Sequence, residues 1–250
     1  MEDEPYLIQN TADLFWRFAQ QSPTYPVPLE EIVGWAFPLW LHSVPRLSLH
    51  SVRDWLIASN LVCPFLGKDR RLRGCLFAYR DQGVIFLECD DPPDEQRFTL
   101  AHELAHFLLD YWLPRQRAIV VLGERIRDVL DGVRVPTVEE RIHAVLASTP
   151  LGVHSHLMER PEQGLPASVV LHVETRADLL ALEILAPVAL LLASSHMCPS
   201  TPHALRLSRL TATLVNQYGL PLSIAAPYAR RLLRAEGGPT IQDWLQGLSA

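Results

Sequence analysis

The sequence predicts an α+β fold in which a mostly helical chain carries a short antiparallel β-sheet beside one long apolar helix. Apolar residues recur at helical spacing over most of the chain. Two short runs rich in apolar and aromatic residues, 74–79 and 83–88, flank the turn sequence Arg-Asp-Gln-Gly, which is typical of a β-hairpin. With 250 residues, 48% of them hydrophobic, the chain is long enough to bury a core without disulfides.

The first half of the chain is predicted to hold short helices, the hairpin and then the long helix. Prolines at 23, 26 and 28 separate the first two helices, and residues 37–47 are expected to be irregular because prolines interrupt them. Ser51 is a candidate N-cap for the third helix, and Asp94 for the long one, which should end before Pro114. The expected helices are 11–20, 29–36, 52–59 and about 95–112.

The second half is predicted to be helical apart from one Gly-, Pro- and His-rich stretch. Residues 113–170 form a separate segment with an amphipathic part, 118–130, and a helix, 138–147. Pro187 suits the first turn of a helix, and Gly219 suits the end of one. The further expected helices are 173–185, 188–194, 205–218 and 223–235.

Composition argues against several classes of protein. Lys and Arg number 22 against 28 Asp and Glu, so a formal charge of −6 makes nucleic-acid binding through the overall field unfavourable. The four cysteines are scattered without a Cys-x-x-Cys pair, which indicates reduced thiols. The acidic start, Met-Glu-Asp-Glu, does not fit a signal peptide, and the longest apolar run, 184–193, is too short for a membrane span. We therefore expect a cytoplasmic protein with no membrane partner.

The long helix contains the pattern His102-Glu103-Leu104-Ala105-His106, or HExxH. Residues four apart lie on one helix face, so His102 and His106 can bind one metal ion. Glu103 projects nearby and can act as a general base toward a metal-bound water, whose pKa Zn²⁺ lowers to about 7. The pattern also occurs by chance on solvated helices. Here its flanking residues are almost all apolar, and burying these polar groups without a metal would be costly.

A later helix offers a third ligand. A catalytic zinc usually has three protein ligands and a water. Glu174 and Asp178 are four apart on an apolar helix, so Glu174 can complete the metal site and Asp178 can accept a hydrogen bond from a ligand histidine. Two acidic residues near the start of a helix are also common without a metal. The pattern therefore indicates a metal site only in combination with the HExxH motif.

These two blocks, RFTLAHELAHFLLD (97–110) and ETRADLLALEILAP (174–187), resemble the ImmA/IrrE family of zinc metallopeptidases. The resemblance spans roughly residues 25–235 and is sharp only in the two blocks. It implies a zinc-metallopeptidase core with the sheet beside the active-site helix and a thermolysin-like (gluzincin) site that holds one Zn²⁺ per chain. The implied ligands are His102, His106 and Glu174, and the implied base is Glu103.

The sequence departs from the family pattern in a few places. Asp178 stands where the family often has Asn, and Leu180 where it often has Phe. The gap between His106 and Glu174 is long, so 113–170 is interpreted as an insertion that covers the cleft, packs elsewhere or binds a partner. We predict one metallopeptidase domain over 1–250, with this insertion and a C-terminal helical pair at about 205–235.

Other residues were weighed for the site. His154, His156 and His172 can ligate metal, but histidines in such a polar stretch are more often exposed. His196 or His203 can stabilise an oxyanion, although a surface histidine in a Pro-rich loop is an equally good interpretation. The arginines of 206–234 superficially suggest a DNA-binding helix pair, but packing on the core is favoured.

The sequence thus predicts a zinc metalloendopeptidase that hydrolyses peptide bonds. The resemblance implies regulatory cleavage of an intracellular protein substrate, such as a helix-turn-helix transcriptional repressor, without direct nucleic-acid binding. The alternatives are a catalytically silent zinc-fold regulatory or protein-binding module and a DNA-associated regulator. The intact Glu103 favours the enzyme, because a silent module has no need of a base beside the metal.

The hairpin also predicts how substrate binds. Only two strands are evident before the HExxH helix, so one strand should present a free edge beside the metal. We expect that edge to pair with an extended substrate backbone. The expectation fails if both edges of the hairpin are already paired.

Overall fold

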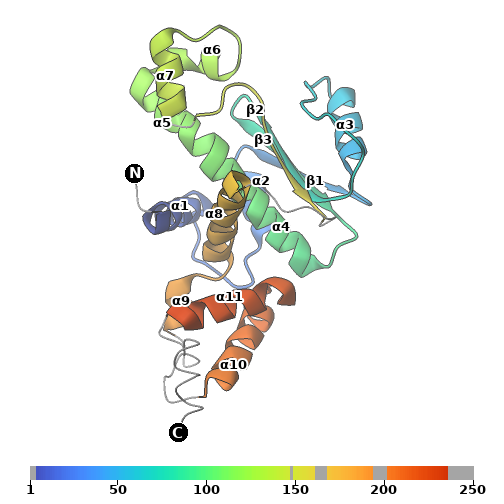
Figure 1. The fold of residues 1–250 in the computed structure, drawn as a ribbon, viewed down its shortest axis with the longest axis vertical. Coiled ribbons are helices and arrows are strands. Elements are labelled where there is room, and N and C mark those ends of the chain that lie inside the picture. Colours follow the sequence, from blue (N-terminus) through green and yellow to red (C-terminus); the bar gives the residue numbers. More distant parts are fainter. Residues whose placement is uncertain (1–3, 147–148, 161–167, 194–201, 236–250) are drawn as a thin grey trace.

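The computed structural model describes residues 4–146, 149–160, 168–193 and 202–235. It has the predicted α+β architecture, with a small sheet among many helices (Figure 1). The strands are β1 (Leu39–Val44), β2 (Leu72–Tyr79), β3 (Gln82–Glu88) and β4 (His154–Glu159). The main helices are α1 (Glu4–Ala19), α2 (Leu29–Ala36), α3 (Leu49–Ala58), α4 (Pro93–His106), α5 (Leu113–Leu122), α7 (Val138–Leu146), α8 (Ser168–Leu185), α9 (Val188–Leu192), α10 (His203–Asn216) and α11 (Leu222–Ala235).

The sheet is larger than predicted and mixed. Its order is β1-β3-β2-β4: the predicted β2–β3 hairpin is antiparallel, β1 runs parallel to β3, and β4 runs antiparallel to β2. Residues 37–47, predicted to be irregular, contain β1. Both edges of the hairpin are therefore paired, which overturns the expectation that one of them is free for substrate.

Both faces of the hairpin are buried, which explains its nearly continuous apolar sequence. Alternate side chains point to opposite faces of a strand. Leu76, Ala78, Ile85 and Leu87 join the larger core with α1, α2, α4 and α8, whereas Cys75, Phe77, Val84 and Phe86 join a second core with α3. Helix α4 therefore lies against one face of the sheet and α3 against the other (Figure 1).

The long apolar helix differs from the prediction at both ends. Pro92, not Asp94, precedes its first residue, and Asp94 lies in its first turn, where an acidic group suits the helix dipole. Pro114 does not end it. The chain passes through a π-helical turn, η1 (Phe107–Trp112), into α5, where Pro114 occupies the first turn and needs no backbone donor. Helix α3 likewise begins earlier than predicted, with Ser48 as N-cap and Ser51 completing a capping box.

The C-terminal helical pair packs on the larger core. Leu210 and Leu214 of α10 and Leu232 and Leu233 of α11 are buried there, and Arg206 is itself buried at 8% exposure. Gly219 has the left-handed backbone expected after a helix, with φ +66°. Cys63, Cys75 and Cys89 are free thiols, and Cys198 lies outside the described residues. Within the described ranges, the helices are too short or too polar to cross a bilayer.

The first part of the predicted insertion, α5 to Asp131, is fixed to the hairpin by a buried cation. Arg115 has no exposed surface, and its guanidinium donates to Asp81 in the hairpin turn (2.7 Å), to Asp131 (2.6 Å) and to the carbonyl of Leu130 (2.8 Å). This network holds α5 and the turn after α6 (Arg127–Leu130) against the sheet. Strand β4 lies later in the chain and pairs with β2 of the same sheet.

Replacing this arginine should destabilise the fold. We expect Arg115→Met to lower the free energy of unfolding by about 3 kcal/mol, because two carboxylates lose their buried partner. Denaturant unfolding followed by circular dichroism measures the change. Arg141→Met, at an exposed position of α7, is the matched control and should change stability by less than about 0.5 kcal/mol. Equal effects of the two variants would contradict the assigned role of Arg115.

Candidate metal centre

Helix α4 carries the HExxH residues on its most deeply buried stretch. His102 and His106 are 2% and 1% exposed, and their Nε2 atoms are 3.1 Å apart. One turn of helix separates them, so both imidazoles point to the same side, as the spacing predicted. The apolar neighbours that drive α4 into the core also force these histidines out of water.

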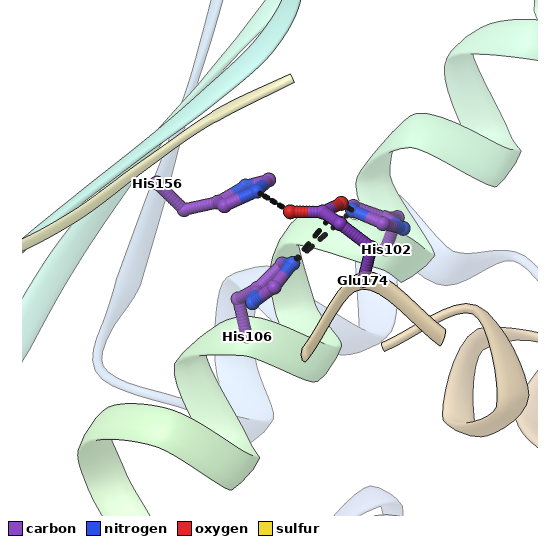
Figure 2. Close-up of side chains that lie close together, drawn as sticks. All are labelled: His102, His106, His156 and Glu174. Atoms are coloured by element: carbon purple, nitrogen blue, oxygen red, sulfur yellow. Dashed lines mark hydrogen bonds and ion pairs between the residues drawn. The ribbon is translucent and has the colours of Figure 1, made fainter. Parts of the chain in front are cut away.

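Helix α8 brings Glu174 and Asp178 to the same place. Glu174 Oε2 is 3.2 Å from His102 Nε2 and 3.9 Å from His106 Nε2. Asp178 Oδ1 is 2.9 Å from His102 Nδ1, on the far side of that ring. Both residues predicted from α8 thus meet the HExxH face. Glu174 lies at the Nε2 atoms of the two histidines (Figure 2), and Asp178 lies at Nδ1 of His102.

A second orienting carboxylate escaped the sequence analysis. Asp110 Oδ2 is 2.8 Å from His106 Nδ1, four residues earlier, and Arg176 of α8 holds the other oxygen at 2.6 Å. Asp110 lies in the π-helical turn η1, which begins directly after His106. Such turns occur frequently at functional sites. The helical spacing from His106 was the signal that could have identified Asp110 in advance.

His156 enters the cluster from β4, contrary to the expectation of an exposed histidine. Its side chain is 14% exposed, and its ring stacks on that of His106 with centroids 3.6 Å apart. Its Nε2 is 2.9 Å from Glu174 Oε1. The signal was the alternation in His-Ser-His, which places both histidines on one face of a strand. The exposed interpretation failed because pairing with β2 buries that face against α4.

The other weighed histidines stay outside the cluster or outside the described residues. His154 is half-buried, its ring lies 5.9 Å from that of Tyr111, and desolvation lowers the pKa of its imidazole to about 4. His203 begins α10 and is not among the grouped residues. The side chain of His172 and the whole of His196 lie outside the part of the chain that the structure describes.

Glu103 lies beside the cluster with no exposed surface. Its Oε2 is 2.9 Å from His156 Nδ1, and its Oε1 has no hydrogen-bond partner among the described residues. The carboxylate lies close to Gly74 of β2, where an added Cβ would approach Oε1 to 3.2 Å. A buried carboxylate oxygen without a partner is costly, so this oxygen remains available to a further polar group or ion.

Each of the three clustered histidines follows one pattern. Its Nδ1 faces a carboxylate: Asp178 for His102, Asp110 for His106 and Glu103 for His156. An Nδ1–H that donates to a carboxylate leaves the Nε2 lone pair free for a metal and fixes the ring orientation. The three Nε2 atoms and Glu174 then face one another.

The pKa values reflect this crowding of donors and carboxylates. Burial lowers the pKa of His102, but hydrogen bonds to Asp178 and Glu174 outweigh it and raise that pKa to about 9. Burial likewise opposes protonation of His156, yet the charge and hydrogen bond of Glu103 raise its pKa to about 10. Burial raises the pKa of Glu174, but its histidine partners hold it well below the usual range. The cluster thus strongly favours positive charge at its centre.

The residues fit a metal ion. One ligand atom from each of His102, His106, His156 and Glu174 lies within 4.8 Å of every other. Imidazole nitrogens with a carboxylate oxygen are a common donor set for zinc, and a carboxylate behind each histidine is the usual outer arrangement. The unpartnered Oε1 of Glu103 and the preference for positive charge agree with this fit.

Comparison with known proteins bears on the sheet and the HExxH helix. Residues 62–121, which include β2, β3, α4 and most of α5, match the family model described as Peptidase_M78, IrrE N-terminal-like domain. No curated protein and no solved structure matches the chain. The family match confirms the resemblance to the ImmA/IrrE family. Residues 62–121 are thus similar to the IrrE N-terminal-like domain described by this family model.

Proposed function

We propose that the chain is a zinc-dependent endopeptidase. The observation that carries the proposal is the meeting of His102, His106 and Glu174 at one point, with carboxylates behind both histidines. Three protein ligands of this kind, with an acidic residue adjacent to the first histidine, are the arrangement of catalytic zinc sites. The match to a peptidase family supports peptide hydrolysis as the reaction.

The residues of the chain have distinct tasks in this proposal. When bound, Zn²⁺ supplies Lewis-acid polarisation of a carbonyl and lowers the pKa of water at the site. Asp178 and Asp110 hold the imidazoles of His102 and His106 so that Nε2 faces the metal. Glu103 accepts the proton of the attacking water and passes it to the leaving amine. Its complete burial keeps that carboxylate fixed beside the cluster.

The substrate is proposed to be a protein cleaved within the cell, such as a helix-turn-helix repressor. The support is the ImmA/IrrE resemblance. The DNA-associated alternative is weakened by the net charge of −6 and by the packing of α10 and α11 on the core.

One observation favours the second candidate, a catalytically silent zinc module. His156 supplies a fourth donor and also occupies Oε2 of Glu103. Structural zinc sites are closed by four protein ligands, whereas catalytic sites keep one position open. The two candidates therefore differ in whether His156 stays in place.

Metal analysis provides the first test. We expect one Zn²⁺ per purified chain and its loss in His102→Ala and His106→Ala, because each removes a nitrogen ligand. Inductively coupled plasma mass spectrometry gives the stoichiometry. His50→Ala, at an exposed histidine of α3, is the control and should keep the metal. A stoichiometry unchanged in both ligand variants would rule out the site.

Substitutions of the two α8 carboxylates should weaken zinc binding to different extents, according to whether the residue is a ligand or orients one. Glu174→Ala should weaken zinc binding more than Asp178→Asn, since the first loses a ligand and the second only an orienting acceptor. Loss of an orienting partner costs about 10–100-fold in metal affinity. Competition with a chromophoric chelator measures both. The reverse order would move the third ligand away from Glu174.

The role of Glu103 as general base is tested in a form of the chain that cleaves a protein substrate, either the wild type or a variant. Glu103→Gln should keep zinc and fold but lower kcat by about 10²–10⁴-fold, because the amide cannot accept a proton. Fluorescent casein hydrolysis and circular dichroism give the two readouts. Glu95→Gln, in the first turn of the same helix, is the control. Cleavage by Glu103→Gln at the rate of the unsubstituted form would exclude this role.

A further inference from the structure

Strand β4 occupies the place where an extended peptide would reach the metal. It pairs antiparallel with β2, with His156 opposite Leu76 and Leu157 opposite Cys75. Without β4, β2 would be the edge of the sheet, and β2 is the strand whose Gly74 contacts Glu103 and Thr99 of α4. An unpaired edge strand binds extended peptides through its main chain. The chain's own β4 has taken that position.

From this strand, His156 is presented to the cluster as a metal ligand would be. Its Nδ1 faces a carboxylate, as in His102 and His106. Its Nε2 faces Glu174 among the other donors (Figure 2). The ligand set of HExxH and Glu174 leaves one position open, and a fourth protein donor closes it.

The same side chain also engages the candidate base. Glu103 Oε2 lies 2.9 Å from His156 Nδ1, so this carboxylate serves His156 in the way that Asp178 and Asp110 serve the other two histidines. A carboxylate oxygen that accepts this hydrogen bond is not free to take a proton from water. One residue of β4 therefore occupies both the open position and one oxygen of the base.

Strand β4 is less deeply buried than β2, the strand with which it pairs. None of its residues is fully buried, whereas five consecutive residues of β2 are, Gly74–Ala78. Its far end is fixed by ion pairs at the surface, Glu159 with Arg70 and Arg160 with Asp91. Partly exposed ion pairs contribute little, and segments with few buried contacts open at low free energy.

We propose that β4 is a built-in inhibitory strand. In the resting chain His156 is a fourth metal ligand, and the peptidase is latent until β4 leaves the edge of β2. This inference rests on the proposed function, since latency presupposes an enzyme. The proposal explains two observations together: the chain has the HExxH motif and Glu174 expected of a catalytic site, yet four protein donors surround the metal position.

The first test compares Co²⁺-loaded wild type, His156→Ala and His154→Ala. The last is a matched control, a half-buried histidine two residues away on the same face of β4. We expect His156→Ala to weaken Co²⁺ binding about tenfold or more, as loss of a ligand requires. It should also bind acetohydroxamate, a small metal chelator, about tenfold more tightly than wild type, because apparent affinity scales with the fraction of open sites.

The Co²⁺ absorption spectrum reports the binding of Co²⁺ and the binding of acetohydroxamate, and neither measurement needs a substrate. His154→Ala should behave as wild type. If His156→Ala leaves Co²⁺ affinity and acetohydroxamate affinity unchanged, His156 is not a ligand and the proposal is overturned. If His154→Ala matches His156→Ala, the effect comes from loosening the strand and the ligand assignment fails.

The second test leaves the cluster intact. Leu157→Cys places a thiol opposite Cys75, and paired positions of antiparallel strands lie within disulfide range. After oxidation with diamide, checked by thiol titration, the bridged chain should lose acetohydroxamate binding, and dithiothreitol should restore it. Cys75→Ser with Leu157→Cys is the control. A bridged chain that binds the chelator as tightly as the reduced chain overturns the proposal.

Casein hydrolysis separates failure of this inference from failure of the proposed function. Wild type that binds acetohydroxamate as tightly as His156→Ala and also cleaves casein retains the function and overturns the inhibitory strand. The converse result is that His156→Ala binds the chelator more tightly than wild type but no form of the chain cleaves casein. His156 would then still be assigned as a metal ligand. That result overturns the endopeptidase, and with it the latency.

Discussion

The close packing of α4 on β2 is the constraint on which the candidate site depends. At Gly74 an added Cβ would lie 2.6 Å from Thr99 Cγ2 and 3.2 Å from Glu103 Cγ, so only glycine lets the helix lie this close to the strand. This contact places Glu103 directly against β2. Strand β4 pairs with the same part of β2, with Met158 opposite Gly74 and His156 opposite Leu76. The residue of β4 that meets the cluster is therefore the one that this register brings next to Glu103.

Burial of the cluster then dictates its composition. Histidines and carboxylates without partners are costly to bury, so each must find a hydrogen bond or a metal. The structure meets this demand with a carboxylate behind each histidine and with Arg176 behind Asp110. The result is a rigid set of nitrogens directed at one point, and rigidity of this kind is what a metal site requires.

The sequence predicted the parts of the site that depend on local spacing. His102 and His106 share one helix face, and so do Glu174 and Asp178, because each pair is one helical turn apart. The two faces meet, as expected. The hairpin was also local, since its two strands adjoin along the chain. Their metal-binding roles remain predictions, which the proposed variants test.

What the sequence could not predict depends on pairing between distant residues. β1 and β4 are strands because they pair with β3 and β2, and in neither sequence do apolar residues alternate with polar ones as in a half-buried strand. His156 was interpreted as exposed because it lies in a polar stretch of the sequence, whereas its burial comes from a partner strand about 80 residues earlier. Pro114 was expected to end a helix, but the π-helical turn before it lets the chain continue.

The position of β4 has a consequence for specificity under the inhibitory-strand proposal. One strand would both close the metal and cover the edge of β2, so the two must open together. A peptide substrate would then compete with β4 for the same main-chain groups of β2 rather than bind a free edge. Only a substrate whose own contacts outweigh those of β4 would open the site, since a binding partner shifts an equilibrium by no more than its differential affinity. Selectivity for one protein would then follow from latency, without deep side-chain pockets at the metal.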